Sequence, residues 1–198
     1  MGRPRKDAHR EDTVLRLLRA AEAEFAAHGF RDARLGDIAE AAGIRRSSLL
    51  YHFGSKAKLH AEVVERAFGE LAEATASAMS ARGGLAENVD GVVESLLAFA
   101  DDRPGLVTIV LRELVDTTST GRALVVQQLA ALVDRLEAAV LIWAADAPGV
   151  DTFPVRAAIL QVMSAYLLRV ASGDVGTALW GDDDHTRTLA RLLLVRET

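Results

Sequence analysis

Residues 37–56 read DIAEAAGIRRSSLLYHFGSK, and this stretch decides how the amino-terminal part of the chain folds. A short helix is predicted to end at Gly43, because apolar residues precede it at helical spacing: Leu35, Ile38, Ala39 and Ala42. A second short helix is predicted from Ile44 to about Tyr51. Two short helices joined by a tight glycine turn are typical of a helix-turn-helix, whose second helix lies in the major groove of DNA.

A longer helix is predicted before this pair, over residues 12–28. Its apolar residues recur along one helical face: Val14, Leu17, Leu18, Ala21 and Phe25. Asp12 or Thr13 could cap its start, and Gly29 could end it. Because two short helices cannot bury themselves alone, we expect Ile38, Leu49 and Phe53 to pack against this stripe.

The second short helix is rich in side chains that can hydrogen-bond to a phosphate or a base edge. Its predicted exposed residues are Arg45, Arg46, Ser47, Ser48, Tyr51 and His52. This composition favours contact with nucleic acid.

Four cations stand at the starts of helices, where the helix dipole disfavours positive charge by roughly 0.3–1 kcal/mol each. Arg45 and Arg46 open one helix, and Lys56 and Lys58 follow Ser55, the expected N-cap of the next. An external phosphate would reverse the sign of this effect, since backbone N–H groups and cations would then converge on it. We therefore interpret both helix starts as phosphate clamps; the alternative is two pairs of solvated charges.

Residues 37–56, together with residues 20–30 (AAEAEFAAHGF), resemble the DNA-binding signature of the TetR family of transcriptional regulators. The resemblance implies an all-helical fold and a recognition helix that begins at Arg45. It places Ser47, Ser48, Tyr51 and His52 at DNA-facing positions and Lys56 at a phosphate. Three positions depart from the family pattern and leave the operator sequence open: Arg34 in place of a capping Thr, Gly36 before Asp37, and Leu50 where a Tyr is usual. Arg34 could itself reach a phosphate and is therefore also a candidate DNA contact.

Residues 1–10 are expected to form a flexible basic arm. Arg3, Arg5 and Lys6 surround a proline, which discourages helix. Such an arm can place guanidinium groups in a narrow minor groove. The alternative is a basic tail that adds only general attraction.

Composition predicts an all-α protein of about nine helices, because Ala and Leu dominate the 198 residues while β-branched and aromatic runs are scarce. The net charge of −5 is unevenly divided. Residues 1–60 carry 12 Lys and Arg against 8 Asp and Glu, and residues 61–198 carry 11 against 20. An acidic body would repel a polyanion, so DNA is expected to meet only the amino-terminal part.

We expect a cytoplasmic protein without membrane contact. No apolar run follows Met1, and the longest uninterrupted one, residues 138–145, is far below the roughly 20 residues that a membrane span requires. The absence of cysteine excludes disulfides, thiol catalysis and cysteine-ligated zinc.

Two domains are predicted: residues 1–56 for DNA binding, and residues 57–198 for effector binding and dimerisation. After a linker helix, five further helices are expected over residues 85–101, 105–117, 121–146, 155–172 and 184–196, with breaks at Gly- and Pro-rich segments, one of them residues 172–184.

The last two helices are apolar on more than one face, which suggests that they pack on the body and on a second copy of the chain. The predicted interface residues are Ile159, Val162, Tyr166, Leu189 and Leu193. A buried central helix would give the same pattern. Two recognition helices about 34–36 Å apart would read a palindromic operator, which one copy cannot do with sufficient specificity.

A pocket for a small apolar or amphipathic effector is implied by the family resemblance. Its candidate apolar lining is Phe68, Phe99, Leu106, Val110, Leu114, Trp143 and Met163, and its candidate polar anchors are Arg112, Gln127 and Gln161. The same residues could form an ordinary core.

An enzyme is not expected, and neither is a cofactor or a metal. No Gly-rich phosphate loop is present, and the five histidines lack metal-ligand spacing. Arg112 and Asp116 are interpreted as an i, i+4 salt bridge, and residues 182–184 as a helix cap region. We therefore predict a dimeric, ligand-responsive transcriptional regulator and favour a repressor, with activation left open by the sequence. The rival hypothesis is a nucleoid-type protein that binds DNA without sequence preference or effector.

Overall fold

The computed structural model describes residues 6–80, 82–145 and 153–195, with side chains from residue 12 onward. Ten helices and no strand are found in these residues, so the all-α prediction is confirmed. The helices are α1 (Lys6–Asp32), α2 (Leu35–Ala41), α3 (Arg46–Phe53), α4 (Lys56–Met79), α5 (Leu85–Asp102), α6 (Pro104–Val115), α7 (Arg122–Trp143), α8 (Val155–Ala171), α9 (Asp174–Trp180) and α10 (Thr186–Leu194).

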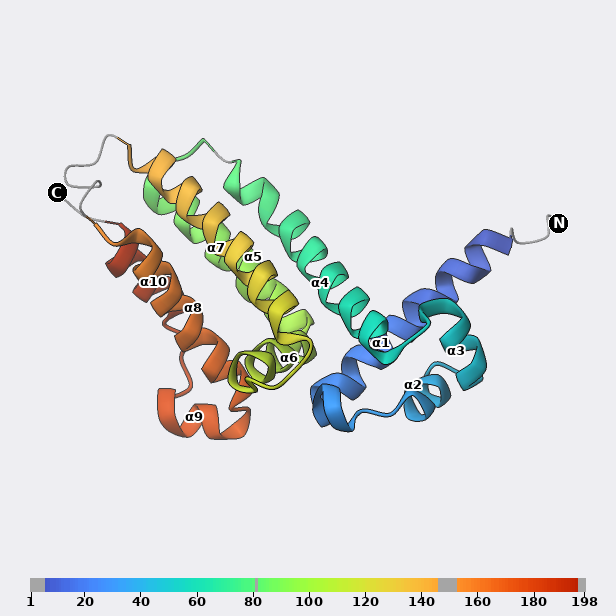
Figure 1. Ribbon diagram of the computed structural model, residues 1–198. Helices are drawn as coiled ribbons and strands as arrows, with labels where there is room; N and C mark the ends of the chain where they lie inside the picture. Colours follow the sequence, from blue (N-terminus) through green and yellow to red (C-terminus); the bar gives the residue numbers. More distant parts are fainter. Residues whose placement is uncertain (1–5, 81, 146–152, 196–198) are drawn as a thin grey trace.

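The helices form two parts joined by α4 (Figure 1). The short helices α2 and α3 pack with α1 into a small amino-terminal unit, which we call the head. The remaining helices form a bundle, which we call the body, and α4 runs from the head along it. Because α6 packs against α1, the head is held by two helices and not only by a covalent link.

The first helix is longer than predicted, since α1 begins at Lys6 and not at residue 12. Asp12 and Thr13 lie within the helix and do not cap its start, and residues 6–10 belong to α1 rather than to a flexible arm. Gly29 breaks the helical geometry as predicted, with φ of +74°, and a last helical turn follows to Asp32.

The helix-turn-helix is built as the glycine turn predicts. Gly43 has φ of +69°, a left-handed conformation that side chains other than hydrogen disfavour. The turn brings Ile38 and Leu49 inward, and both are fully buried together with Leu17 and Phe25 of α1. Burying such side chains stabilises the unit by about 1.5–3 kcal/mol each, which fixes α3 within the head without using its outer face.

The body differs from the prediction at its carboxyl end. A short helix, α9, lies within the segment that was predicted as a break, and α10 spans Thr186–Leu194 instead of residues 184–196. Within the described ranges no helix is both long and apolar enough to span a bilayer.

Candidate nucleic-acid interface and ligand cavity

The outer face of α3 is directed into solvent along its whole length. Arg45 is the N-cap residue of the helix, and Arg46 is its first helical residue. Arg45, Arg46, Ser47, Ser48 and Tyr51 are all exposed, and His52 is half-buried against the Tyr51 ring. Tyr51 is 83% exposed, which is unusual for a large aromatic side chain.

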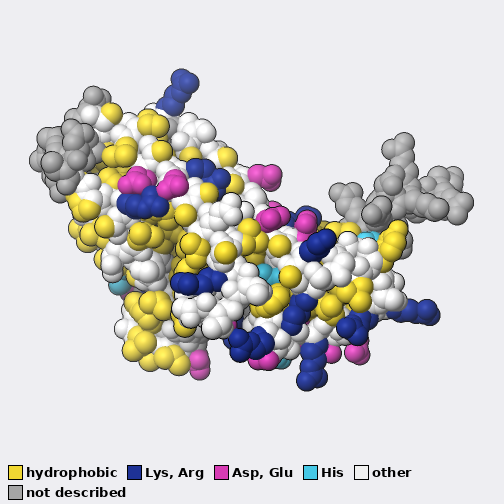
Figure 2. Space-filling view, viewed as in Figure 1, with side chains coloured by type: hydrophobic (Ala, Val, Ile, Leu, Met, Phe, Trp, Pro, Cys, Tyr) yellow, Lys and Arg dark blue, Asp and Glu magenta, His cyan; other side chains and the backbone are white. Residues whose placement is uncertain are grey.

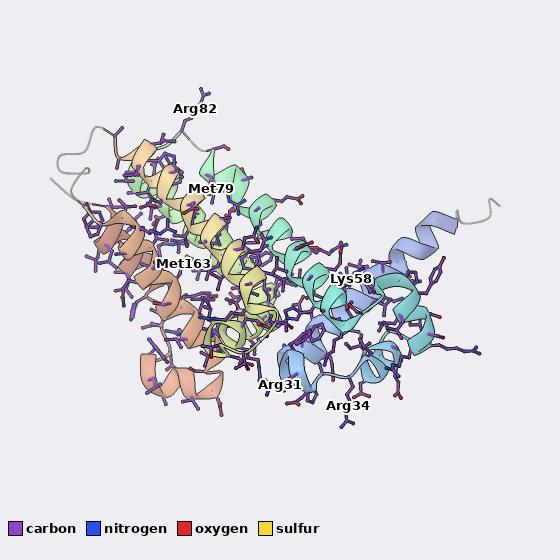
Figure 3. The ribbon with its side chains drawn as sticks, viewed as in Figure 1. Arg31, Arg34, Lys58, Met79, Arg82 and Met163 are labelled. Atoms are coloured by element: carbon purple, nitrogen blue, oxygen red, sulfur yellow. The ribbon has the colours of Figure 1, made fainter. Side chains whose placement is uncertain are left out.

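Several cations of the head have side chains without a partner among the described residues, and four of them lie at or beside the starts of α2, α3 and α4: Arg34, Arg45, Arg46 and Lys58. Figure 2 shows Lys and Arg side chains projecting from the part of the surface that the head forms, and in Figure 3 Arg34 points outward from its edge. Since none of these four groups is neutralised internally, each is free to meet an anion.

Lys56, which was predicted to contact a phosphate, also makes hydrogen bonds within the protein. Its Nζ atom donates hydrogen bonds to the carbonyl oxygens of Arg31, at 2.8 Å, and Ala33, at 3.1 Å, and lies 5.0 Å from the centre of the Phe30 ring. The unfavourable placement of this cation at the start of α4 is thus offset within the protein, by carbonyls at the end of α1. Lys56 holds α4 to α1, with one donor left for another contact.

The other helix starts follow the prediction more closely. Ser55 is the N-cap of α4 and accepts a hydrogen bond from the Lys58 backbone N–H. Arg34 precedes α2 without a side-chain cap, and its own backbone N–H donates to Glu24 Oε1. Arg34, Arg46 and Lys56 line one shallow depression of the surface.

The predicted amino-terminal arm lies only partly within the described residues. Arg3 and Arg5 lie outside the described residues, and Lys6 begins α1 with a side chain that is also outside them.

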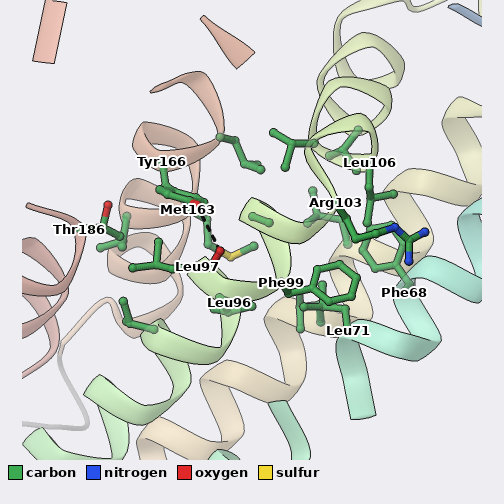
Figure 4. Close-up of a pocket in the computed structure, with 18 residues that line it drawn as sticks. Phe68, Leu71, Leu96, Leu97, Phe99, Arg103, Leu106, Met163, Tyr166 and Thr186 are labelled. Carbon is green, nitrogen blue, oxygen red and sulfur yellow. Dashed lines mark hydrogen bonds between the residues drawn. The ribbon is translucent and has the colours of Figure 1, made fainter. Parts of the chain in front are cut away.

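The body contains an apolar cavity between α4, α5, α6, α7 and α8, of about 720 Å³ including space open to solvent. In Figure 4, Phe68, Leu71, Phe99, Leu106 and Arg103 lie on one side of it, and Leu97, Tyr166 and Thr186 on the other. The predicted residues that line it are Phe68, Phe99, Leu106, Val110 and Met163.

The remaining predicted pocket residues lie elsewhere. Trp143 lines a separate small cavity, Leu114 packs against the core outside the main cavity, and both glutamines, Gln127 and Gln161, are exposed. Their spacing on amphipathic helices could not reveal which face turned inward.

Arg112 lies in an open groove between the ends of α1 and α6, where its Nη2 donates to the Ala27 carbonyl at 3.1 Å. Asp116 accepts hydrogen bonds from the backbone and hydroxyl of Thr118 instead of pairing with Arg112. The predicted Arg112–Asp116 salt bridge is therefore wrong.

The polar residues at the cavity were mostly missed by sequence reasoning. Tyr166 was assigned to a dimer interface, but its hydroxyl donates to Asp101 Oδ1 at 3.1 Å and Leu97 O at 3.4 Å beside the cavity. Burial and the neighbouring Asp101 raise the pKa of Tyr166 well above its ordinary value.

Arg103, the N-cap residue of α6, was not singled out at all. It lines the cavity, and its guanidinium group contacts Glu22 of α1 and Glu70 of α4. The hydrogen bond to Glu22 raises the pKa of Arg103, so it is charged throughout the ordinary pH range.

A buried polar pair joins α4 to α6 beneath the head. His60 Nε2 lies 3.2 Å from Glu113 Oε1, and both side chains are almost fully buried. The rings of Phe25 and Phe30 contact His60 edge-on. Burial lowers the pKa of His60 to about 4 and raises the pKa of Glu113, so the structure disfavours both charged forms.

The proposed interface residues are divided between the interior and the surface. Ile159 and Val162 are buried within the single chain and are therefore not available to a second copy. Leu189 is exposed and Leu193 is half-buried on α10. The exposed apolar side chains beside them are Leu160 and Leu168 of α8 and Leu192 of α10.

The carboxyl-terminal acidic run ends just before α10, whose N-cap residue is His185 and has no side-chain cap. Asp184 Oδ1 accepts hydrogen bonds from the backbone N–H and hydroxyl of Thr186, the first residue of that helix. Across the described ranges, no three His, Cys, Asp or Glu residues are grouped in a way that could hold a metal ion.

The amino-terminal part of the chain is similar in sequence to known regulatory proteins. Residues 17–63 match the model of the bacterial regulatory proteins of the tetR family. The chain is 32% identical over 98 residues to the uncharacterised HTH-type transcriptional regulator YdgC of Bacillus subtilis, and 29% identical over 103 residues to the HTH-type transcriptional repressor SCO4008 of Streptomyces coelicolor. These matches cover 48% and 52% of the chain and half of each relative.

The fold is shared over nearly the whole chain with solved structures. The transcriptional regulator FadR of Bacillus subtilis, in complex with stearoyl-CoA, superposes with a TM-score of 0.76 at 14% identity. The superposition covers 93% of this chain and 99% of that protein. At this identity the similarity concerns the fold alone.

Proposed function

We propose that the chain, whose residues 17–63 match the tetR family of bacterial regulatory proteins, is a transcriptional repressor of that family that binds a palindromic DNA operator as a dimer and is released by a small molecule. In this proposal residues 1–56 contact DNA, and residues 57–198 hold the effector and the dimer interface.

The observation that carries the proposal is the outer face of α3. Leu49 anchors the helix inward, while Tyr51 stands 83% exposed beside Arg45 and Arg46, whose charges no described residue neutralises. If the outer face of α3 served only stability, it would not combine an exposed aromatic ring with unpaired cations at the start of the helix. A DNA major groove supplies the phosphates and base edges that these groups lack.

A dimer through α8 and α10 is supported by the exposed leucines on these two packed helices. A second copy would cover this apolar surface and hold two α3 helices at fixed spacing. The buried Ile159 and Val162 support the interface from behind and do not form its surface.

The cavity of the body is proposed as the effector site. Its lining is apolar except at its edges, which suits an apolar or amphipathic molecule. The FadR structure holds stearoyl-CoA, a molecule with a long apolar chain, on a similar fold.

The proposal is tested by selecting duplexes that bind the full chain from a random library and measuring their affinity by fluorescence anisotropy. We expect a conserved palindrome and a linear fall of log affinity with log salt, with a slope of about 0.9 per phosphate contact. Combining Arg45→Ala with Arg46→Ala should weaken binding at least about tenfold and flatten this slope.

Arg82→Ala is the matched control, because Arg82 is an exposed arginine at the far end of α4 from the head (Figure 3). It should leave the affinity unchanged. Equal binding of selected and random duplexes would favour a nucleoid-type protein, and a flat salt response would remove DNA as the partner.

A further inference from the structure

Arg103 stands where the cavity and the head meet. It is the only charged side chain among the described residues that line the cavity, and its guanidinium carbon lies 5.9 Å from the centre of the Phe99 ring. In Figure 4 its stem borders the cavity while the guanidinium group reaches toward α4. A molecule in the cavity therefore has this cation at its edge.

The guanidinium group joins three helices. Its Nε lies 3.2 Å from both carboxylate oxygens of Glu22 on α1, and its Nη2 also bonds to Glu22. Its Nη1 bonds to Glu70 on α4, which in turn accepts a 2.8 Å hydrogen bond from Arg66. Arg103 on the α5–α6 connection thus holds both helices that carry the head.

The two carboxylates depend on Arg103 to different degrees. Glu70 keeps Arg66 as a second cation, and although partial burial would raise its pKa, hydrogen bonds from Arg66 and Arg103 bring that pKa below its usual value. Glu22 is buried, and among the described residues Arg103 is its only cationic partner. Loss of Arg103 would leave Glu22 as an uncompensated buried charge.

The packing around Glu22 is so close that the loss of its partner would affect the position of α1. A Cβ atom on Gly105 would lie 3.2 Å from Glu22 Oε1 and 3.5 Å from the Ala26 Cβ, so α1 and α6 touch closely here. An unpaired Glu22 can regain hydration only if α1 moves away from α6. Such a movement changes the position of the head relative to the body.

From these observations we propose that Arg103 reports occupancy of the cavity to the head, and that the effector is an apolar molecule with a single anionic group. The proposal rests on the function proposed above. The anion pairs with Arg103 in place of Glu22, the stranded carboxylate separates α1 from α6, and operator binding weakens. Arg103 is a positioning residue for the head as well as a ligand contact.

The side of the cavity opposite Arg103 offers no counter-charge for an anion, which favours an anionic group beside Arg103. Tyr166 already donates its hydroxyl proton to Asp101 and Leu97 O, and no cation lines that side within the described part of the chain. An anionic group therefore finds its counter-charge only at Arg103, while the apolar chain fills the remaining space.

The test uses three probes with the same ten-carbon chain: decanoate, 1-decanol and decyltrimethylammonium. Binding to the full chain is followed by calorimetry, the separation of α1 from α6 by hydrogen exchange of α1 peptides, and operator affinity by anisotropy. Decanoate is expected to bind, to increase exchange in α1, and to weaken operator binding by roughly 5–150-fold. Decanol is expected to bind without either effect.

Three variants separate the proposed role from a merely structural one. Arg103→Gln should weaken operator binding without any probe and abolish the response to decanoate, because Glu22 is unpaired permanently. Adding Glu22→Gln to Arg103→Gln removes the stranded charge, so operator binding should recover while decanoate remains without effect. Arg191→Gln, which breaks an ion pair with Asp90 between α10 and α5, is the matched control and should respond to decanoate as the wild type does.

An equal effect of decanol, a response confined to decyltrimethylammonium, or no binding of decanoate would overturn the ligand class. A response to decanoate that survives in Arg103→Gln would overturn the role of Arg103. If the chain binds no duplex at all, the proposed function fails, and the exchange of α1 still decides whether Arg103 couples the cavity to the head.

Discussion

His60 and Glu113 place two ionisable groups where the head, α4 and α6 meet, with almost no access to water. In such surroundings a charge is costly, and the pair is most stable when neither group is ionised. The 3.2 Å contact gives each group a polar neighbour without requiring a full charge. The junction is consequently stable at neutral pH but sensitive to acid.

We predict that His60 makes the protein acid-labile between pH 6.5 and pH 4. An unfolded chain protonates this histidine near pH 6.5 whereas the folded protein does so near 4, so the unfolded state binds more protons between these values. The free energy of unfolding should therefore fall as the pH falls, by up to about 3 kcal/mol in total. Urea unfolding at a series of pH values measures it.

Glu113 acts in the opposite direction, because its pKa is raised and the folded state keeps its proton to higher pH. The comparison is therefore made in a Glu113→Gln background, with and without His60→Leu. If the free energy of unfolding falls equally with decreasing pH with and without His60→Leu, a group other than His60 is responsible.

Several single residues illustrate what the sequence could reveal about the site. The exposure of Arg45, Arg46 and Tyr51 could be predicted, because Leu49 fixes the inward face of a short helix and the opposite face follows from helical geometry. The roles of Lys56 and Arg103 could not. Lys56 binds carbonyls 25 and 23 positions away, and Arg103 binds a carboxylate 81 positions away. Such pairs depend on the tertiary packing and leave no local pattern.

At the scale of elements, glycine has two structural roles that the sequence alone did not distinguish: it can form a turn with positive φ, or it can allow close packing inside a helix. Gly43 is in a turn with positive φ and was interpreted correctly. Gly176 lies inside α9, where a Cβ atom would come within 2.8 Å of the Arg169 carbonyl oxygen. This glycine permits close packing of α9 on α8, so the predicted break is a helix.

We predict that two glycine-to-alanine substitutions near α4 change stability in opposite directions. At Gly121, the N-cap of α7, a Cβ atom would lie 2.4 Å from His60 Cε1, so Gly121→Ala should lower the free energy of unfolding by about 1–3 kcal/mol. At Gly69, in the exposed interior of α4, no atom lies within 4 Å, and Gly69→Ala should raise it by about 0.5–1 kcal/mol.

Both variants are measured by urea unfolding under the same conditions. Gly69→Ala also serves as the control, since it adds the same methyl group as Gly121→Ala at a position where the methyl group meets no other atom. If Gly121→Ala were as stable as the wild type, the His60–Glu113 junction would be looser than the close approach implies.

At the scale of the whole molecule, the division of labour follows from how charge and apolar surface are distributed. The exposed cations at the start of α3 lie on the head, the cavity lies inside the body, and exposed leucines gather on α8 and α10 at the far side of the body from the head (Figure 1). The basic head and acidic body could be predicted from composition. The assignment of buried and exposed apolar faces on α8 could not, because both faces carry similar residues and only packing distinguishes them.

The last prediction concerns the pairing of two chains. Leu192 is 72% exposed on α10, and in a symmetric dimer through α8 and α10 it would be buried twice. Leu192→Glu would remove about 3–6 kcal/mol of apolar burial and introduce two charges, so the dimer should weaken more than 100-fold. Sedimentation at micromolar concentration should then show a monomer, with much weaker operator binding, because the two α3 helices are no longer held together.

Val115→Glu is the matched control, because Val115 is 80% exposed but lies at the end of α6, in the groove beside α1. It introduces the same charge and should leave the dimer intact. If Val115→Glu dissociated the dimer and Leu192→Glu left it intact, the interface would instead lie at the junction of head and body. The exposed leucines of α8 and α10 would then need another cover, and the spacing of the two recognition helices would have to be set by the head itself.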